Sequence, residues 1–435
     1  TYDLATLTIF NSAFAVATAV LGYVTTWYPR ILAKEPQRFP QLATVGLLTA
    51  LVATASLGVY LALFGRLDPI LLALGAAALV AYSWPASAFL SLYRQKQSVV
   101  SNFASQAIKL VSAYFIKQSP SAYLAIATTT IMAIPPVLCK VTKPVIKEAL
   151  HTIKIIVKGT PFQTLYLLAV AISNLTTFAL LMAGGDKLLS YLYILFQVGK
   201  SVYPALTIST LMYGSLLVEN DKLKRALIDG AIYLYLFLLV ATIMAKTPEW
   251  YLAVLRPTEL YNSELIMAIR LAAFSLIFYG IYTHIDTTLR GVEEKTIFSL
   301  RDKPAKALIF DIIISPLNIT LMYVLAKIYG ILGVVITQAI IYTFATSYRL
   351  KLLGTHSLEL LIKLYIPTIT ALVVISMSPI PLVPYNKGNI IEVLITYIPN
   401  IVILSIISAL LMISISPPSR QVATFLLRKY LSFNS

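Results

Sequence analysis

Polar and ionisable side chains occur inside long apolar stretches of this sequence, spaced so that they share one face of a helix. They recur at intervals of three, four or seven residues, which is the period of an α-helical face. The clearest groups are Asn102, Gln106 and Lys109; Gln197 and Lys200; Tyr279, Asp286 and Arg290; and Asp311, Ser315 and Asn318. Because charged groups are costly in hydrocarbon, such faces usually line a hydrated cavity, and the sequence predicts one.

Two of these residues are candidates for binding a coupling ion, either a proton or sodium. Asp286 and Asp311 are carboxylates inside apolar stretches, and a partly desolvated carboxylate can take up and release a proton during a transport cycle. Arg290 follows Asp286 by four residues on the same helix face, so a plain salt bridge between the two is an equal alternative.

The elements that carry these residues are membrane-spanning helices. Of 435 residues, 58% are hydrophobic and only 12% are charged, about half the charge of a soluble domain. A span needs roughly 20 apolar residues, and thirteen stretches qualify. They are 4–28, 41–64, 69–93, 97–116, 120–139, 159–183, 187–215, 224–245, 264–289, 305–326, 329–348, 358–383 and 389–415. The predicted fold class is an all-α polytopic membrane protein.

The orientation of the helices follows from the basic residues of the loops. Alternate loops hold 24 and 7 of the Lys and Arg residues, and the basic side is cytoplasmic by the positive-inside rule. The C-terminus is then inside and Thr1 outside. The net charge of +16 belongs to the cytoplasmic face, so we expect the plasma membrane and its anionic lipids as surroundings rather than a nucleic-acid partner.

The chain divides into two lobes at a basic amphipathic segment. In residues 140–158, apolar and basic side chains recur with helical period on two different faces. This pattern is typical of a helix lying on the cytoplasmic leaflet. A solvated loop helix is the alternative. We expect an N-terminal lobe of five helices over 1–139, this linker over 140–158, a C-terminal lobe of six helices over 159–353, and two additional helices with a cytoplasmic tail over 354–435.

Little in the sequence supports a cofactor, a metal or covalent catalysis. There is one cysteine, Cys139, and there are three histidines, too few for a thiolate cluster or a haem or zinc site, and no nucleotide-binding P-loop motif occurs. We therefore expect a protein that is not an enzyme and needs no cofactor.

Several segments together resemble the multidrug/oligosaccharidyl-lipid/polysaccharide exporter superfamily, and its polysaccharide and lipid-linked oligosaccharide flippases most. They are the helix and outer turn over 159–204 ending in Val202-Tyr203-Pro204, the stretch from Tyr261 and Glu264 to Leu289-Arg290-Gly291, and Tyr329-Gly330-Ile331-Leu332-Gly333. The resemblance implies two six-helix lobes around a central cavity, often with two extra helices to make fourteen. Thirteen spans and an outside Thr1 are both explained if the family's first helix is missing from this sequence, which we predict.

The resemblance implies a flippase that moves a polyprenyl-phosphate-linked glycan across the membrane by alternating access. Such a head group is anionic and sugar-bearing, so it needs cations, amides and aromatic partners. The candidate substrate-binding residues are Arg30, Asn102, Gln106, Lys109, Gln197, Lys200, Arg270 and Tyr279. For each cation an ion pair or a lipid phosphate contact is the alternative.

Two other functions remain open. A drug or cation antiporter of the same superfamily should carry more buried acids than bases, but the interior count is equal, with Lys109, Lys200 and Arg270 against Asp229, Asp286 and Asp311. A non-transporting membrane subunit of a larger assembly would have a closed interior.

Overall fold

In the computed structural model of the chain, the described residues form helices joined by short connections. No strand occurs among them. The structure describes residues 13–14, 16–18, 20–63, 67–83, 85–101, 104, 139, 145–199, 202–255, 257–383 and 390–431. By its contacts the chain divides into two compact units. Unit 1 comprises Thr1–Leu167 and Glu294–Asp302, and unit 2 comprises Leu168–Glu293 and Lys303–Ser435.

Unit 1 holds the N-terminal helices. Its described elements are α2 (Tyr28–Lys34), η1 (Pro36–Arg38), α3 (Phe39–Leu63), α4 (Pro69–Ser83), α5 (Ala86–Tyr93), α8 (Ile146–Val157) and the first turns of α9 (Thr160–Gly199). One buried apolar cluster includes Ala53 and Leu57 of α3 and Leu71 and Leu79 of α4. These two helices therefore pack against each other along their length.

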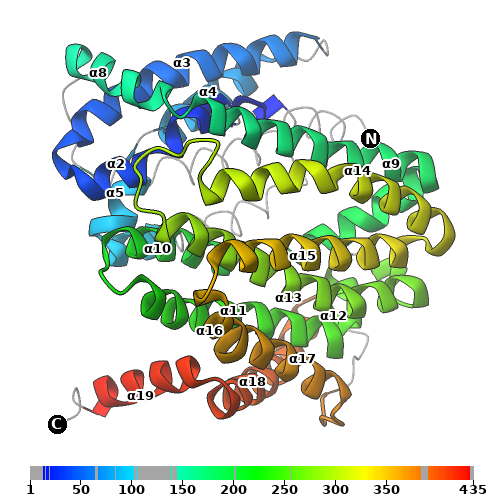
Figure 1. Cartoon of the computed structure of the whole chain (residues 1–435). Helices are drawn as coiled ribbons and strands as arrows, with labels where there is room; N and C mark the ends of the chain where they lie inside the picture. The colour runs from blue at the N-terminus through cyan, green and yellow to red at the C-terminus, as the bar shows by residue number, and fades with distance from the viewer. Residues whose placement is uncertain are drawn as a thin grey trace. The chain divides into compact units, whose positions relative to one another are not determined.

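Unit 2 contains most of the long helices (Figure 1). Its described elements are the part of α9 from Leu168 on, α10 (Tyr203–Val218), α11 (Lys222–Lys246), α12 (Pro248–Leu255), η3 (Pro257–Glu259), α13 (Ser263–Val292), α14 (Lys303–Tyr329), α15 (Ile331–Leu353), α16 (His356–Leu360), η4 (Leu361–Tyr365), α17 (Ile366–Met377), α18 (Ile390–Ile415) and α19 (Pro417–Leu431). A single large core includes Phe237 of α11, Ile281 of α13 and Val334 of α15. Helix α13 lies between α11 and α15, and α15 packs on α14.

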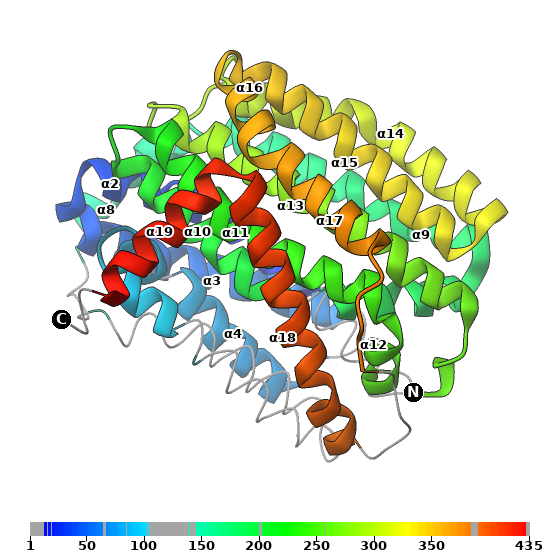
Figure 2. The ribbon, with the colours of Figure 1, turned by 90° about the horizontal axis from the view of Figure 1, so that it is seen from below.

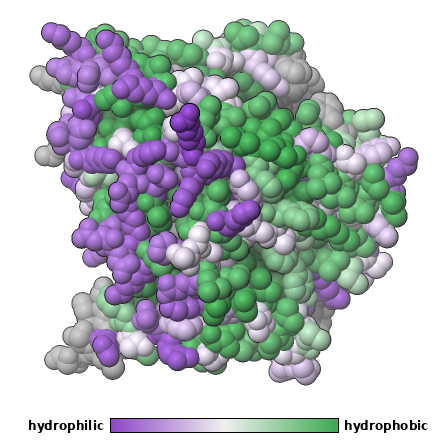
Figure 3. Space-filling model, in the orientation of Figure 1, coloured by the Kyte–Doolittle hydropathy of each residue, from purple (hydrophilic) through white to green (hydrophobic). Residues whose placement is uncertain are grey.

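Seven helical segments of the described residues are long and apolar enough to cross a membrane. They are Pro36–Leu63, Lys222–Lys246, Ser263–Val292, Lys303–Tyr329, Ile331–Leu353, His356–Met377 and Tyr397–Ile415. Each coincides with a span predicted from hydropathy, so the predicted fold class is confirmed. Figure 3 shows hydrophobic flanks over α14 and α15 and hydrophilic residues gathered over the turn between α10 and α11. The predicted spans 97–116 and 120–139 lie mostly outside the described residues, as does the first part of the span 4–28.

Two predicted spans are interrupted in the structure. The span expected over 69–93 consists of two helices, α4 and α5, because Pro85 precedes α5 and a proline cannot donate a helical hydrogen bond. The break expected after residue 183 occurs at Gly185, whose φ of 61° is not helical. The following span, expected over 187–215, is broken again between the end of α9 and the start of α10.

The turn between α14 and α15 contains the Tyr-Gly-x-x-Gly segment noted in the sequence, and its geometry explains both glycines. Gly330 has a φ of 58°, a left-handed conformation that glycine adopts without strain. A Cβ at Gly333 would collide with the backbone carbonyl of Leu325 in α14. Both glycines are therefore required for two long helices to reverse direction while their backbones remain in contact.

The predicted linker segment contains a separate helix, α8, over Ile146–Val157. Its Ala149, Thr152 and Ile156 are buried, and the helix packs on α3. Ile146 and Leu150 remain exposed. The helix is thus confirmed, and its contact with a lipid leaflet stays a prediction.

Candidate functional site

Arg349 of α15 lies at the centre of a charged cluster formed by three spanning helices. Its side chain is fully buried. Its Nη1 and Nη2 donate to the two carboxylate oxygens of Asp311 in α14, at 2.9 and 2.6 Å. Its Nε donates to Oδ1 of Asp286 in α13 at 2.9 Å. One guanidinium therefore connects all three helices.

All five N–H donors of Arg349 have acceptors. Besides the three bonds to carboxylates, Nη1 donates to the carbonyl of Ala345 at 3.3 Å and Nη2 to the hydroxyl of Tyr282 at 3.2 Å. The ring of Tyr282 also lies 4.4 Å from the guanidinium carbon. Because a guanidinium has five donors in a fixed plane, this environment satisfies an arginine completely, and a lysine could not replace it.

Arg290 completes the cluster from the end of α13. Its Nε lies 2.8 Å from Oδ2 of Asp286, which is the i,i+4 ion pair that the sequence offered as an alternative to ion binding. The two aspartates and two arginines carry no net charge together. The side chains of Asp286, Asp311 and Arg290 are each about one-fifth exposed, so the cluster borders on solvent or head groups on one side while its centre is closed.

The packing of the helices explains this geometry. Helix α15 contacts both α13 and α14 extensively, whereas α13 and α14 touch little. Tyr342, two turns before Arg349 on α15, packs its ring against Tyr279 and Tyr282 at centroid distances of 5.3 and 5.6 Å. Three tyrosines thus continue the polar face of α13 and α15 from the charged cluster into the helix bundle.

The third aspartate within a spanning helix, Asp229 of α11, is also paired. It accepts hydrogen bonds from Arg225 Nε at 2.8 Å and from Ser215 Oγ at 2.7 Å. Its carboxylate, which the sequence analysis counted among the interior acids, is therefore bonded to an arginine and a hydroxyl.

Arg30 lies in unit 1, under the connection between α13 and α14. Residues Glu294–Asp302 of that connection belong to unit 1. The side chain of Arg30 is buried, its Nε donates to the carbonyl of Lys295 at 2.7 Å, and its guanidinium lies over the ring of Phe298 at 4.3 Å. Phe298 in turn packs against Trp27 and Phe162. Arg30 therefore stabilises the loop 294–302 through contacts with Lys295 and Phe298.

The remaining predicted binding residues are placed as follows. Arg270 is exposed, and its Nη2 lies 3.1 Å from Oε1 of Glu249 in α12. An ion pair of this kind is one of the alternatives given above for the predicted cations. Tyr279 is half-buried in the tyrosine group described above. Asn102, Gln106, Lys109 and Lys200 lie outside the described residues, and for Gln197 only the backbone is described.

Arg349 was not predicted as a site residue, because by hydropathy it belongs to the basic loop after the span 329–348. The structure places it inside α15, fully buried. The signal that could have found it is charge balance, because two aspartates in neighbouring spans need two cations and Arg290 supplies one. Among the described residues there is no group of three His, Cys, Asp or Glu side chains that could hold a metal ion.

Solved membrane transporters share the fold of this chain. A MATE transporter in its straight conformation aligns with a TM-score of 0.57 at 13% identity, over 81% of this chain and 89% of that one. An outward-facing multidrug resistance MATE family transporter of the MOP superfamily aligns with 0.57 at 15% identity, over 85% and 88%. The lipid II flippase MurJ, in an inward closed conformation, gives 0.47 at 15% identity over 94% and 92%, a similarity too remote to bear on function.

No protein family profile matches the sequence, and no curated protein matches it. The likeness to the MATE structures is one of fold. The chain is a polytopic helical membrane protein with the fold of the MATE transporters of the multidrug/oligosaccharidyl-lipid/polysaccharide exporter superfamily, which confirms at the level of fold the resemblance identified from its sequence.

Proposed function

We propose that this protein is a flippase that moves a polyprenyl-phosphate-linked glycan across the cytoplasmic membrane by alternating access, with its C-terminus inside. The observation that carries the proposal is the pairing of the interior carboxylates. In the described residues, each of the three aspartates within spanning helices is bonded to an arginine: Asp229 to Arg225, Asp286 to Arg290 and Arg349, and Asp311 to Arg349. A cationic cargo would find these acids already neutralised.

Arg349 changes the charge balance of the interior. By sequence alone, the interior acids and bases are equal in number. Arg225, Arg290 and Arg349 are bonded to the three aspartates and Arg270 to Glu249. The other two interior cations predicted from the sequence, Lys109 and Lys200, lie outside the described residues. The predicted helices that carry them, 97–116 and 187–215, contain no Asp or Glu. A surplus of positive charge favours an anionic phosphate or pyrophosphate head group.

The test is transport in liposomes that contain the purified protein and a fluorescent polyprenyl-pyrophosphate glycan. We expect flipping to depend on the protein, and Lys109→Ala and Lys200→Ala to slow it roughly ten- to hundredfold, since a bond to a charged group contributes about 1.5–3 kcal/mol. Lys351→Ala is the matched control, because Lys351 is an exposed lysine of α15. Full flipping by both variants would refute the assignment of these lysines.

For energy coupling we propose that Asp286 and Asp311 bind the proton or sodium ion in competition with Arg349, and that Arg290 retains Asp286 when Arg349 leaves. A protonated or sodium-bound carboxylate no longer attracts a guanidinium, so ion binding would release α15 from α14. Bistable ion pairs of this kind are a common device in conformational switching.

Replacing the carboxylate of Asp311 by an amide tests the coupling. Asp311→Asn should abolish the acceleration of flipping by a proton or sodium gradient while leaving slow, gradient-independent flipping. A variant that responds normally to both gradients would show that the cluster has a structural role only.

A cationic-drug antiporter is the second candidate, because two of the structures that share this fold are MATE transporters and one is described as a multidrug resistance transporter. The same liposomes loaded with ethidium separate the two. Ethidium export without glycan flipping would establish the antiporter. Activity toward neither cargo would support the third reading, a non-transporting membrane subunit.

A further inference from the structure

The C-terminal helix α19 leaves the membrane-spanning helix α18 almost without a linker. Helix α18 ends at Ile415 and α19 begins at Pro417. On α18, Val402, Ile406 and Leu410 are exposed at four-residue spacing, which marks the flank that faces lipid. Helix α19 therefore begins where the apolar span ends, at the boundary between hydrocarbon and head groups.

Specific contacts fix the bend between the two helices. The hydroxyl of Ser416 donates to the carbonyl of Lys363 at 3.0 Å. The guanidinium of Arg420 donates to the carbonyls of Ser414 at 2.9 Å and Ile413 at 3.3 Å, which are free at the C-terminus of α18. Figure 2 shows α19 turning sharply away from the direction of α18. The direction in which α19 runs is thus set by the fold.

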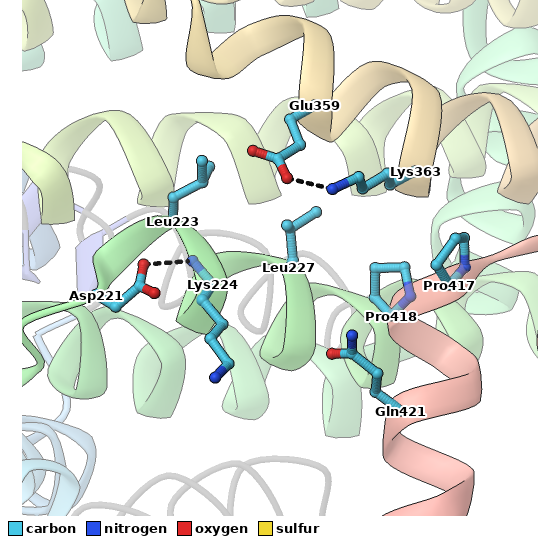
Figure 4. Close-up of a pocket in the computed structure, with 9 residues that line it drawn as sticks. All are labelled: Asp221, Leu223, Lys224, Leu227, Glu359, Lys363, Pro417, Pro418 and Gln421. Carbon is cyan, nitrogen blue, oxygen red and sulfur yellow. Dashed lines mark hydrogen bonds and ion pairs between the residues drawn. The ribbon is translucent and has the colours of Figure 1, made fainter.

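The first turns of α19 are packed on the protein. Pro418 and Ser419 are buried, and Val422 contacts the core of unit 2. A cavity of about 370 Å³ lies between these turns, α11 and α16 (Figure 4). Its charged lining residues are Asp221, Lys224, Glu359 and Lys363. Two acids balance two bases, and Lys363 is paired with Glu359, so the cavity has no surplus charge to attract an ion.

The second half of α19 is uncovered in the described chain. Phe425, Leu426 and Leu427 are 66%, 58% and 63% exposed. By their spacing, Ala423, Leu426, Leu427 and Tyr430 share one stripe of the helix, and Arg420, Gln421, Thr424 and Arg428 share a second stripe. Phe425 and Lys429 lie between the two stripes. The helix contains Arg420, Arg428 and Lys429 and no acidic residue.

We propose that α19 docks in the plane of the membrane on an anionic lipid surface, with its apolar stripe in the acyl boundary and its arginines among the phosphates. Its place at the end of a span, its amphipathic pattern and its purely basic charge all match such a surface. The charge of the loops assigns this end of the bundle to the cytoplasmic leaflet. The inference requires membrane insertion but not the flippase activity.

Spin labels on the full-length protein test the docking. Cys139 is the single cysteine of the sequence, so Cys139→Ala provides a background for Leu426→Cys and, as the matched position on the polar stripe, Thr424→Cys. In vesicles containing phosphatidylglycerol, we expect residue 426 to be accessible to oxygen and residue 424 to a water-soluble nickel complex. Arg428→Gln should reduce the depth of the label at 426, as should vesicles of phosphatidylcholine alone.

Three outcomes would overturn the proposal. Nickel access at both positions would place α19 in water. Protection of residue 426 from both reagents would show that a protein surface, such as a second copy of this chain, covers the helix. Equal depth in the two kinds of vesicle and in Arg428→Gln would show that anionic lipid is not what α19 recognises.

Discussion

Arg349 and Asp311 form a bidentate pair between neighbouring spanning helices, with both carboxylate oxygens of Asp311 bonded at 2.9 and 2.6 Å. The fork geometry fixes the rotation and the height of α15 against α14, because two parallel bonds tolerate little displacement. The same guanidinium reaches Asp286 on α13. A shift of any of the three helices must therefore break charge-assisted bonds, which makes this pair the element that an ion could control.

Truncating Arg349 should destabilise the protein strongly. In Arg349→Ala, Asp311 loses its arginine and Asp286 keeps only Arg290, so a charge remains buried without its partner. Breaking a buried pair in this way costs about 3–5 kcal/mol. The measurement is the thermal unfolding of purified protein in detergent. Arg349→Lys should recover only part of the loss, because an ammonium cannot form the planar fork.

The control for Arg349 is two residues away on the same helix. Lys351→Ala removes an exposed cation and should change the stability by less than about 0.5 kcal/mol. The double variant Arg349→Ala with Asp311→Asn also removes the carboxylate charge that Arg349→Ala leaves unpaired. It should therefore be more stable than Arg349→Ala alone. If the double variant loses the sum of the two single effects, the residues do not interact as the structure indicates.

Gly230→Ala should disrupt a buried polar network at the contact of α11 with α13. A Cβ at Gly230 would collide with the imidazole of His284, which is fully buried. The Nε2 of His284 donates to the carbonyl of Ala226 at 3.1 Å, and Nδ1 accepts from the hydroxyl of Tyr365 at 2.7 Å. Overpacking typically costs about 1–3 kcal/mol, which thermal unfolding would detect.

A matched glycine separates this clash from a general effect of alanine. A Cβ at Gly22 would meet no atom within 4 Å. Gly22→Ala should leave the free energy of unfolding unchanged or raise it by up to about 1 kcal/mol, because alanine has a higher helix propensity than glycine. Equal effects of the two substitutions would rule out the collision with His284.

Hydropathy predicted the spanning helices well because each span must be long and apolar regardless of its partners. It did not predict where a span is interrupted, as between α4 and α5, since Pro85 leaves the average hydropathy of 69–93 unchanged. It also did not predict α19 as a separate helix. Both features depend on local backbone chemistry and tertiary contact, which a window of hydropathy does not measure.

The candidate site was predicted in part. The ion pair of Asp286 with Arg290 was offered by their four-residue spacing as the alternative to ion coupling. Spacing did not predict that Asp311 would share an arginine with Asp286, and the coupling role of these residues stays a prediction. Arg349 was missed because it lies only four residues before the end of α15, where a basic residue is usually a topology signal. The role of Arg30 under the loop 294–302 was equally hidden, since its partners Lys295 and Phe298 are more than 260 residues away in sequence.

The loop 294–302 should lose stability in acid. Asp302 closes this loop by accepting hydrogen bonds from the Ser299 amide at 2.6 Å and from Lys295. Burial alone would raise the pKa of Asp302, but the bonds from Lys295 and Ser299 outweigh it and lower the pKa below its ordinary value. The stabilisation is therefore complete above about pH 4, the unfolded value, and disappears as the pH falls through the lowered pKa.

The pH dependence that Asp302 contributes can be measured by comparing Asp302→Asn with the parent protein. The variant should melt below the parent protein at pH 7, and the gap between the two melting temperatures should stay constant down to about pH 5 and close toward pH 3. If the gap widened in acid, the pKa of Asp302 would be raised rather than lowered on folding. That result would contradict the hydrogen bonds from Lys295 and Ser299 to Asp302.

Arg30 can be tested as a structural residue against its predicted role in binding substrate. Its guanidinium is bonded to the carbonyl of Lys295 and stacked on Phe298, so Arg30→Gln should destabilise unit 1 by about 1–3 kcal/mol and expose the loop 294–302 to proteolysis after Lys295. Arg301→Gln is the control, because Arg301 lies in the same loop with an exposed side chain. The two roles differ in their readout. A loop-holding arginine changes melting and cleavage in the absence of any glycan, whereas a purely substrate-binding arginine leaves both unchanged and raises only the glycan concentration needed for half-maximal flipping.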